Sequence, residues 1–251
     1  MVPNEPTEGA ATVSRLIEHD SAKAARILDS ARDLVRAHGA RKVTISEIAA
    51  AAGVGKGTVY LYWATKEDLI VGLLAREILA WIEEVIDQIA RDPGVVLPRR
   101  LAPLLIKSTM DNPWLRRLRS DEDALWQVLQ RDADRERFAE SSPSAMCGEV
   151  IAILREHDVI RDDLPTARQI QATSALLVGF STIMGRPSDP RTHDADEVEA
   201  ALADAFHVML EPSRDPREAV IAAAAEAVRA RFTQIHAHLL ELVAKGAEGT
   251  R

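Results

Sequence analysis

The sequence of 251 residues is long enough for one large domain or two small ones, and 47% hydrophobic residues indicate a globular chain. A net charge of −8 argues against a protein that coats nucleic acid nonspecifically, although one local surface can still bind DNA. Aromatic residues make up only 4% and alanine is abundant, so helices are favoured over a β-sandwich.

The N-terminal segment and the single cysteine bear on the cellular compartment. The first residues hold two prolines and few large apolar side chains, and we expect a disordered tail over residues 1–18. This tail lacks a basic start before an apolar run, and no apolar stretch approaches the ~18 residues of a membrane span. Cys147 cannot form an intrachain disulfide, which fits a reducing cytosol. We therefore expect a cytoplasmic protein without membrane contact.

The first expected helix runs from about Ser21 to His38. Apolar residues recur on one of its faces at helical spacing, namely Ile27, Ala31, Leu34 and Val35. Gly39 follows, and glycine is common just past a helix end. The sequence thus predicts an amphipathic helix that ends at residue 38.

Two further helix starts carry the capping-box signature. Thr44 precedes a short alanine-rich helix, with Glu47 three residues later, and Thr65 precedes a helix of residues 66–90, with Asp68 three residues later. In such a box each side chain accepts a hydrogen bond from a backbone N–H group of the other residue. Both spacings predict helices that begin directly after the threonines.

Three glycines at alternate positions, Gly53, Gly55 and Gly57, lie between these helix starts. A P-loop requires glycine at position 50 and serine or threonine at position 57, and a dinucleotide-binding loop requires glycine at position 58 and a strand before it. The sequence meets none of these requirements. A helix-turn-helix fits better, with Gly53 in a left-handed turn and Val54 between the two helices.

Residues 27–70 carry a specific set of landmarks: AGV at 52–54, KGT at 56–58, Tyr60, an aromatic residue at 63, and Lys66 before an acidic pair. This segment, about a fifth of the chain, resembles the N-terminal DNA-binding domain of the TetR/AcrR family of transcriptional regulators. Some positions depart from the family pattern. Gly55 stands where serine or threonine is common, and Leu61 where a polar residue often stands, so two possible hydrogen-bonding side chains are missing from the reading helix. Trp63-Ala64-Thr65 replaces the frequent Phe-Pro-Ser.

The resemblance implies that the second helix of the motif enters the major groove of DNA. Lys56 and Thr58 are then candidates for base or phosphate contacts, and the hydroxyls of Tyr60 and Tyr62 can reach phosphates. For Tyr60, packing inside the motif is an equal alternative. By resemblance, Thr44 and Lys66, which stand at two helix starts, anchor phosphates. The predicted DNA contacts are Thr44, Lys56, Gly57, Thr58, Tyr60, Leu61, Tyr62 and Lys66.

Beyond residue 90 the pattern predicts helices separated by breaks rich in proline, aspartate or serine. They are expected at 99–110, 113–119, 121–138, 143–157, 166–185, 194–210 and 216–245. We therefore expect an all-α fold. A helix-turn-helix domain spans residues 19–67 in this interpretation, and a helical ligand-binding and dimerisation domain spans residues 68–251.

The resemblance implies a small-molecule pocket in the second domain and a four-helix dimer interface built by residues 166–185 and 194–210. Large apolar residues that can line a pocket also fill ordinary helical cores, so both interpretations stay open for each candidate. The candidates are Trp81, Met110, Trp114, Trp126, Phe138, Met146, Phe180 and Met184.

A heptad seam marks the C-terminal helix of residues 216–245. Its members are Ile221, Ala225, Val228, Phe232, Ile235, Leu239 and Leu242. The seam either packs this helix on its own domain or adds to dimerisation.

No catalytic or metal-binding constellation stands out, and His236 and His238 point to different sides of a helix. We expect neither an enzyme nor a cofactor. The sequence indicates a ligand-responsive DNA-binding regulator, by family habit a repressor, that binds a palindromic operator as a homodimer and is released by a small molecule. The alternative is an all-α protein-interaction scaffold without DNA binding. A nucleotide-using enzyme is disfavoured because the glycine motifs fail.

Overall fold

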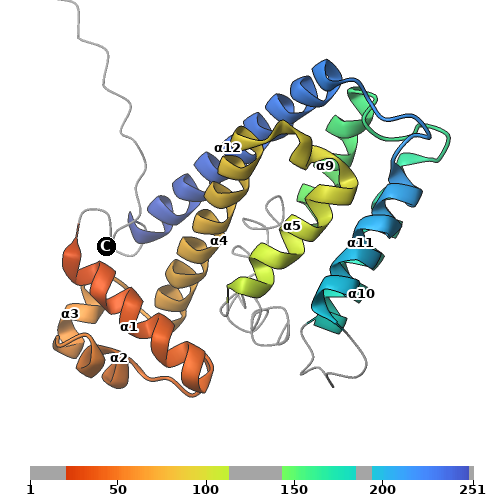
Figure 1. Cartoon of the computed structure of the whole chain (residues 1–251). Helices are drawn as coiled ribbons and strands as arrows, with labels where there is room; N and C mark the ends of the chain where they lie inside the picture. Colours follow the sequence, from red (N-terminus) through yellow and green to blue (C-terminus); the bar gives the residue numbers. More distant parts are fainter. Residues whose placement is uncertain (1–20, 113–142, 185–193, 249–251) are drawn as a thin grey trace, which may run out of the picture.

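The computed structural model describes residues 21–112, 143–184 and 194–248, and these ranges are helical without strands (Figure 1). The elements are α1 (Ala22–His38), α2 (Ile45–Ala51), α3 (Lys56–Tyr60), α4 (Lys66–Arg91), η1 (Pro93–Val96), α5 (Pro98–Asp111), α9 (Pro143–Glu156), α10 (Thr166–Met184), α11 (Ala195–Leu210) and α12 (Glu218–Glu248). The all-α prediction is confirmed, and the expected helix bounds agree within a few residues. The helices expected at 113–119 and 121–138 lie outside the described residues.

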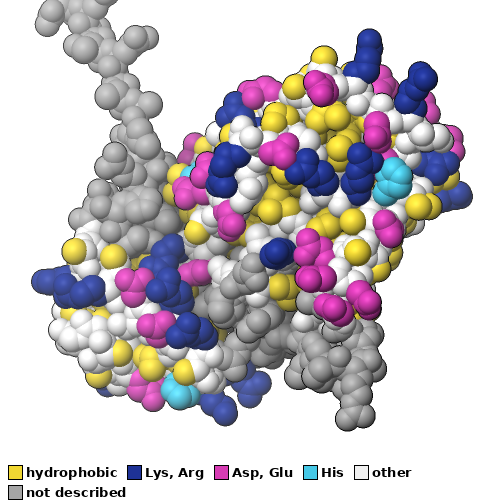
Figure 2. Space-filling view, in the orientation of Figure 1, with side chains coloured by type: hydrophobic (Ala, Val, Ile, Leu, Met, Phe, Trp, Pro, Cys, Tyr) yellow, Lys and Arg dark blue, Asp and Glu magenta, His cyan; other side chains and the backbone are white. Residues whose placement is uncertain are grey.

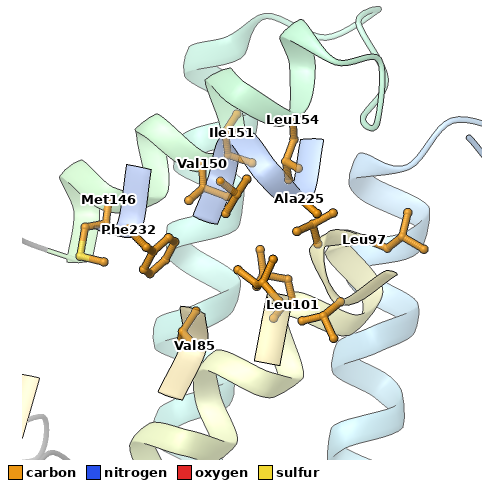
Figure 3. Packing of buried hydrophobic residues seen from close by; sticks show 14 of the residues in the cluster. Val85, Leu97, Leu101, Met146, Val150, Ile151, Leu154, Ala225 and Phe232 are labelled. Carbon is orange, nitrogen blue, oxygen red and sulfur yellow. The ribbon is translucent and has the colours of Figure 1, made fainter. Parts of the chain in front are cut away.

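Two separate hydrophobic cores organise the chain. The first lies between α1, α2, α3 and the start of α4, and Ile27, Ile48 and Val59 are fully buried in it. The second lies between α4, α5, α9, α11 and α12, and Figure 3 shows side chains of α4, α5, α9 and α12 that point into it. The small first core holds the helix-turn-helix as one unit, and the larger second core builds a helical body above it (Figure 1).

Helix α4 belongs to both cores. Its residues Leu69 and Leu73 are fully buried in the first core, and Ile82 is fully buried in the second. Ile78 lies between these groups and packs against both. A single helix therefore connects the three short N-terminal helices to the larger body, as Figure 1 shows.

A polar junction joins α1, α4 and α5 where the two cores meet. The Glu77 carboxylate of α4 is largely buried; its Oε2 accepts a hydrogen bond from the Asn112 side chain at 2.9 Å, and its Oε1 lies 4.0 Å from Nη1 of Arg32. On the same side, Nη1 of Arg76 donates to Oδ1 of Asp29 at 3.0 Å. The end of α5 and the middle of α1 are thus held by neighbouring residues of α4.

The heptad seam of α12 packs inside its own chain. Helix α12 lies along α4 and also contacts η1 and α9 (Figure 1). Ala225, Val228 and Phe232 are buried in the second core, and the Phe232 ring lies 6.4 Å from the Trp81 ring, centroid to centroid. The intramolecular interpretation of the seam is therefore confirmed from Ala225 to Leu239, because these seam residues are already covered by the same chain, while the Leu242 side chain lies outside the description.

The burial pattern of α10 is unusual, because polar side chains of this helix are buried and an apolar one is exposed. Its buried positions are polar, namely Gln169, Thr173 and Ser181, while Val178 is 60% exposed. Gln169 is satisfied locally, since it accepts a hydrogen bond from Arg155 at 2.9 Å. On the neighbouring helix α11, Val208 is 71% exposed. The pair α10 and α11 thus presents apolar side chains outward.

Candidate nucleic-acid interface

The capping box of α2 forms as predicted. The Thr44 hydroxyl accepts a hydrogen bond from the Glu47 backbone N–H at 3.3 Å, and Oε2 of Glu47 accepts one from the Thr44 N–H at 2.8 Å. Hydrogen bonds from the Thr44 hydroxyl and then from its backbone N–H hold the pKa of Glu47 below its usual value. The matching box of Thr65 and Asp68 starts α4. These local pairs fix where both helices begin.

The turn between α2 and α3 depends on Gly53, whose φ of +65° lies in the left-handed region. Its N–H donates to the Ala50 carbonyl at 3.2 Å, and the N–H of Val54 donates to the Ala49 carbonyl at 2.9 Å. This pair of bonds closes the helix end in a Schellman motif, which requires a left-handed residue at this point. Val54 is partly buried against the first core, so the predicted corner is confirmed.

Helix α3 is held from one side only. Val59 is fully buried, whereas Lys56, Gly57, Tyr60 and Leu61 are exposed, with Tyr60 at 51% and Leu61 at 78%. Packing through a single residue leaves the opposite face of the short helix open to solvent. The equal alternative of a buried Tyr60 is thus not what the structure has, while its contact with DNA stays a prediction.

The glycines of α3 have no packing reason inside the described chain. A Cβ atom added at Gly55 or Gly57 would meet no described atom within 4 Å. Neither residue has the positive φ that favours glycine. Gly55 is the N-cap of α3, a position where glycine is accepted, whereas Gly57 lies inside the helix, where glycine is less favourable than alanine, and nothing in the described fold explains its use.

Tyr62 and Trp63 connect the motif to its surroundings. The Tyr62 hydroxyl shares a 2.7 Å hydrogen bond with Oγ of Ser21, the N-cap residue of α1, and its ring packs against the first core. The indole of Trp63 is buried against α4, where a Cβ atom added at Gly72 would lie 2.9 Å from its Nε1. Tyr62 therefore has a role inside the fold, and its predicted phosphate contact is untested.

Basic side chains around α3 differ in whether they are paired. Between residues 23 and 68, eight basic and five acidic side chains give a charge of +3, against −8 for the whole chain. Lys66 donates to the Arg41 carbonyl at 3.1 Å, which brings the start of α4 to the loop before α2. Arg41, Lys42 and Lys56 form no ion pair with any residue in the described ranges. On the face in Figure 2, acidic side chains are interspersed among the basic ones over the N-terminal helices.

The predicted pocket residues that the structure describes all border the second core. Met146 is buried in it, and Nε1 of Trp81 donates to Oγ of Ser108 at 2.8 Å. Met110, Phe180 and Met184 are partly buried against the same cluster. Trp114, Trp126 and Phe138 lie outside the described residues. These positions fit both a pocket wall and an ordinary core, so ligand contact stays a prediction.

Clusters of potential metal ligands and helices able to span a membrane are absent from the described part of the chain. Within it, no three His, Cys, Asp or Glu residues are grouped to hold a metal ion, and no helix has the length and apolar content to cross a membrane. Burial raises the pKa of the Cys147 thiol. A raised pKa lowers the thiolate fraction at neutral pH, and with it the reactivity of this cysteine.

Comparison with known proteins assigns the N-terminal part. The model of the tetR family of bacterial regulatory proteins matches residues 27–73. This chain has a TetR-family domain. The fatty acid metabolism regulator protein of Bacillus subtilis (strain 168) is 34% identical over 64 residues, which span 26% of this chain and 33% of that protein. The resemblance inferred from the sequence is confirmed, and the match covers about a third of the relative's length.

Two solved structures extend the similarity beyond the TetR-family domain. A chain from Shewanella sp. PV-4 assigned to the tetR family has a TM-score of 0.51 at 18% identity, covering 76% of this chain and 99% of that one. Another tetR-family chain, from Mesorhizobium loti MAFF303099, has a TM-score of 0.51 at 22% identity, covering 76% and 98%. At such identities the likeness shows a shared fold alone.

Sequence reasoning missed two residues that contact Tyr62 and Trp63 in the first core, namely Ser21 and Gly72. The Ser21 and Tyr62 hydroxyls share a hydrogen bond across 41 residues of sequence, which no local pattern reveals. Gly72 provides the space for the Trp63 indole. A glycine inside an otherwise apolar helix was the available signal, since such a residue often marks a close approach.

Proposed function

We propose that this protein is a ligand-responsive transcriptional regulator that binds a palindromic DNA operator as a homodimer and is released by a small molecule. The observation that carries the proposal is the open face of α3 in a TetR-family domain, with Lys56, Tyr60 and Leu61 exposed on it. In a helix-turn-helix the second helix lies in the major groove, and its N-terminal residues meet base edges.

Phosphate contacts would position the domain on the duplex, while α3 reads the bases. Arg41, Lys42 and Lys56, which lack ion pairs among the described residues, are suited to phosphates. Thr44 caps α2 and Lys66 begins α4, and at both helix starts the backbone N–H groups and the helix dipole favour an anion. The excess of acidic charge elsewhere would discourage nonspecific DNA binding.

Helices α10 and α11 supply the dimer surface in this proposal. Val178 and Val208 are more than half exposed, and Ala175 and Gly179 beside them are exposed as well. Exposed apolar side chains on two adjacent helices are suited to a matching pair from a second copy. Such a dimer would hold two α3 helices about 34–36 Å apart, one turn of DNA.

In this proposal the effector acts by changing the distance between the two α3 helices of the dimer. Its site is expected among the aromatic and methionine side chains around the second core, including Trp81 and Met110, and α4 leads from there to the TetR-family domain. A ligand shifts the balance between two spacings only if it binds one of them more tightly. Release from DNA therefore requires higher effector affinity for the spacing that does not fit the operator.

The proposal is tested by selecting duplexes from a random library and measuring their affinity by fluorescence anisotropy across a salt series. We expect a selected palindrome whose binding weakens as salt rises. Lys56→Ala should weaken binding about tenfold or more, the loss of a charge-assisted contact, and should reduce the salt slope by about one. Lys107→Ala removes the same charge from the exposed surface of α5 and serves as the matched control.

Equal affinity of the Lys56→Ala and Lys107→Ala variants would place DNA elsewhere on the molecule. Failure to select any sequence, in a protein that folds normally, would favour the scaffold alternative. A pull-down of helical protein partners would then replace the DNA measurements.

A further inference from the structure

Leu61 is the most exposed large apolar side chain in the part of the chain that the structure describes. It directly follows α3, where it is the C-cap residue, and it follows Tyr60 on the open side of the motif. The neighbouring apolar residues behave differently, since Val59 and Trp63 are buried in the first core. The fold of the TetR-family domain therefore does not use Leu61 for packing.

The surroundings of Leu61 indicate what covers it. Lys56 begins the same short helix, is exposed, and forms no ion pair with a described residue. A partner that places negative charge near such a cation and an apolar group near Leu61 satisfies both. A DNA duplex has this combination in its major groove, where phosphates border base edges and thymine bears a C5-methyl group.

On α3, only Lys56, Thr58 and Tyr60 carry polar groups that could form a hydrogen bond to a base. Gly55 and Gly57 offer no side chain at all, and Leu61 has neither donor nor acceptor. Lys56 and Thr58 carry the polar groups in the first turn of the helix. Among the features of the major groove, the thymine methyl is the one that an alkyl side chain recognises by apolar contact.

We propose that Leu61 selects a thymine in each operator half-site by contact with its C5-methyl group. This inference rests on the proposed function, because it requires α3 to lie in the major groove. It adds the chemical class of the base contact: apolar recognition of a methyl group at the position where the family often has a polar residue.

The test replaces each thymine of the selected operator in turn by deoxyuracil, which keeps base pairing and removes only the methyl group. We expect one position per half-site where the substitution weakens binding about fourfold, the equivalent of about 0.8 kcal/mol for one buried methyl-sized group. In the Leu61→Ala variant the same substitution should have no effect. In Lys56→Ala the fourfold effect should persist, although the affinity itself is lower.

The thermal unfolding of Leu61→Ala should match that of the parent, because the side chain is exposed and not part of the core. The inference is overturned if no thymine responds to loss of its methyl group, or if the response is as large in Leu61→Ala as in the parent. It is also overturned if Leu61→Ala alters self-association and leaves DNA affinity unchanged, since Leu61 would then contact protein. Failure to select any operator contradicts the proposed function instead.

Discussion

At the scale of single residues, Gly53 occupies a left-handed backbone conformation that favours glycine. Its φ is +65°, yet an added Cβ atom would meet nothing within 4 Å. The cost of a side chain here is therefore backbone strain without a clash. We expect Gly53→Ala to lower the free energy of unfolding by about 1–2 kcal/mol, measured by urea denaturation.

Gly57→Ala is the matched control for this measurement. Gly57 lies within α3, has no positive φ and has the same open space, so alanine should leave stability unchanged or raise it slightly. Similar losses in both variants would show that the left-handed corner is not the cause.

Glu47 predicts a pH dependence of stability. Its pKa in the folded protein lies below the usual value near 4.5, because Thr44 donates hydrogen bonds to the carboxylate. The contribution is therefore fully present above pH 4.5 and is lost as the pH falls through the lower pKa of the folded state. We expect the stability difference between the parent and Glu47→Gln to shrink in this acidic range, measured by urea unfolding at several pH values.

Glu84→Gln provides the comparison, since Glu84 is an exposed carboxylate in the middle of α4. Its effect on stability should vary less across the same pH range. A Glu47→Gln difference that stays constant from neutral to acidic pH would contradict the capping explanation.

At the scale of elements, α10 departs from the amphipathic pattern because its exposed face carries apolar side chains. Its polar residues are buried, and Val178 faces outward beside the exposed Ala175. If a second copy covers this face, Val178→Asp places a charge without a partner in an apolar interface. We expect this variant to be monomeric at concentrations where the parent is dimeric, as measured by sedimentation.

Ala223→Asp introduces the same charge on an exposed position of α12 and should leave the dimer intact. A dimer that survives Val178→Asp would remove α10 from the interface. Because the seam of α12 is buried in its own chain, that helix could then contribute only through its remaining face.

At the scale of the whole molecule, Glu77 joins the two cores. Replacing it with alanine leaves the Asn112 bond unmade and removes the carboxylate near Arg32 and Arg76. Loss of a partly buried hydrogen-bonded carboxylate should lower the free energy of unfolding by about 1–3 kcal/mol in urea. Glu84→Ala, on the exposed side of the same helix, should change stability by less than about 0.5 kcal/mol. Equal effects of the two substitutions would mean that the junction contributes nothing.

How much could be predicted from the sequence depended on the range of each interaction. The boxes of Thr44 with Glu47 and of Thr65 with Asp68 join residues three apart, so the pattern alone located both helix starts. The heptad spacing identified the apolar face of α12 but not its partner, because periodicity does not say which helix lies opposite.

Interactions between distant residues could not be predicted in this way. The Arg99 backbone N–H at the start of α5 donates to Oε1 of Glu211 at 2.8 Å, across 112 residues. The bond between Ser21 and Tyr62 is another example, because it joins residues that are 41 positions apart in the sequence. Only tertiary packing places these partners together.

The sharing of α4 between the two cores sets how the chain can be divided for engineering. A fragment that ends at residue 67 would lack Leu69, Ile70, Leu73 and Leu74, and the apolar side chains of α1, α2 and α3 that pack against them would be exposed to solvent. A fragment that is meant to keep the first core intact should therefore include α4 to at least Ile78.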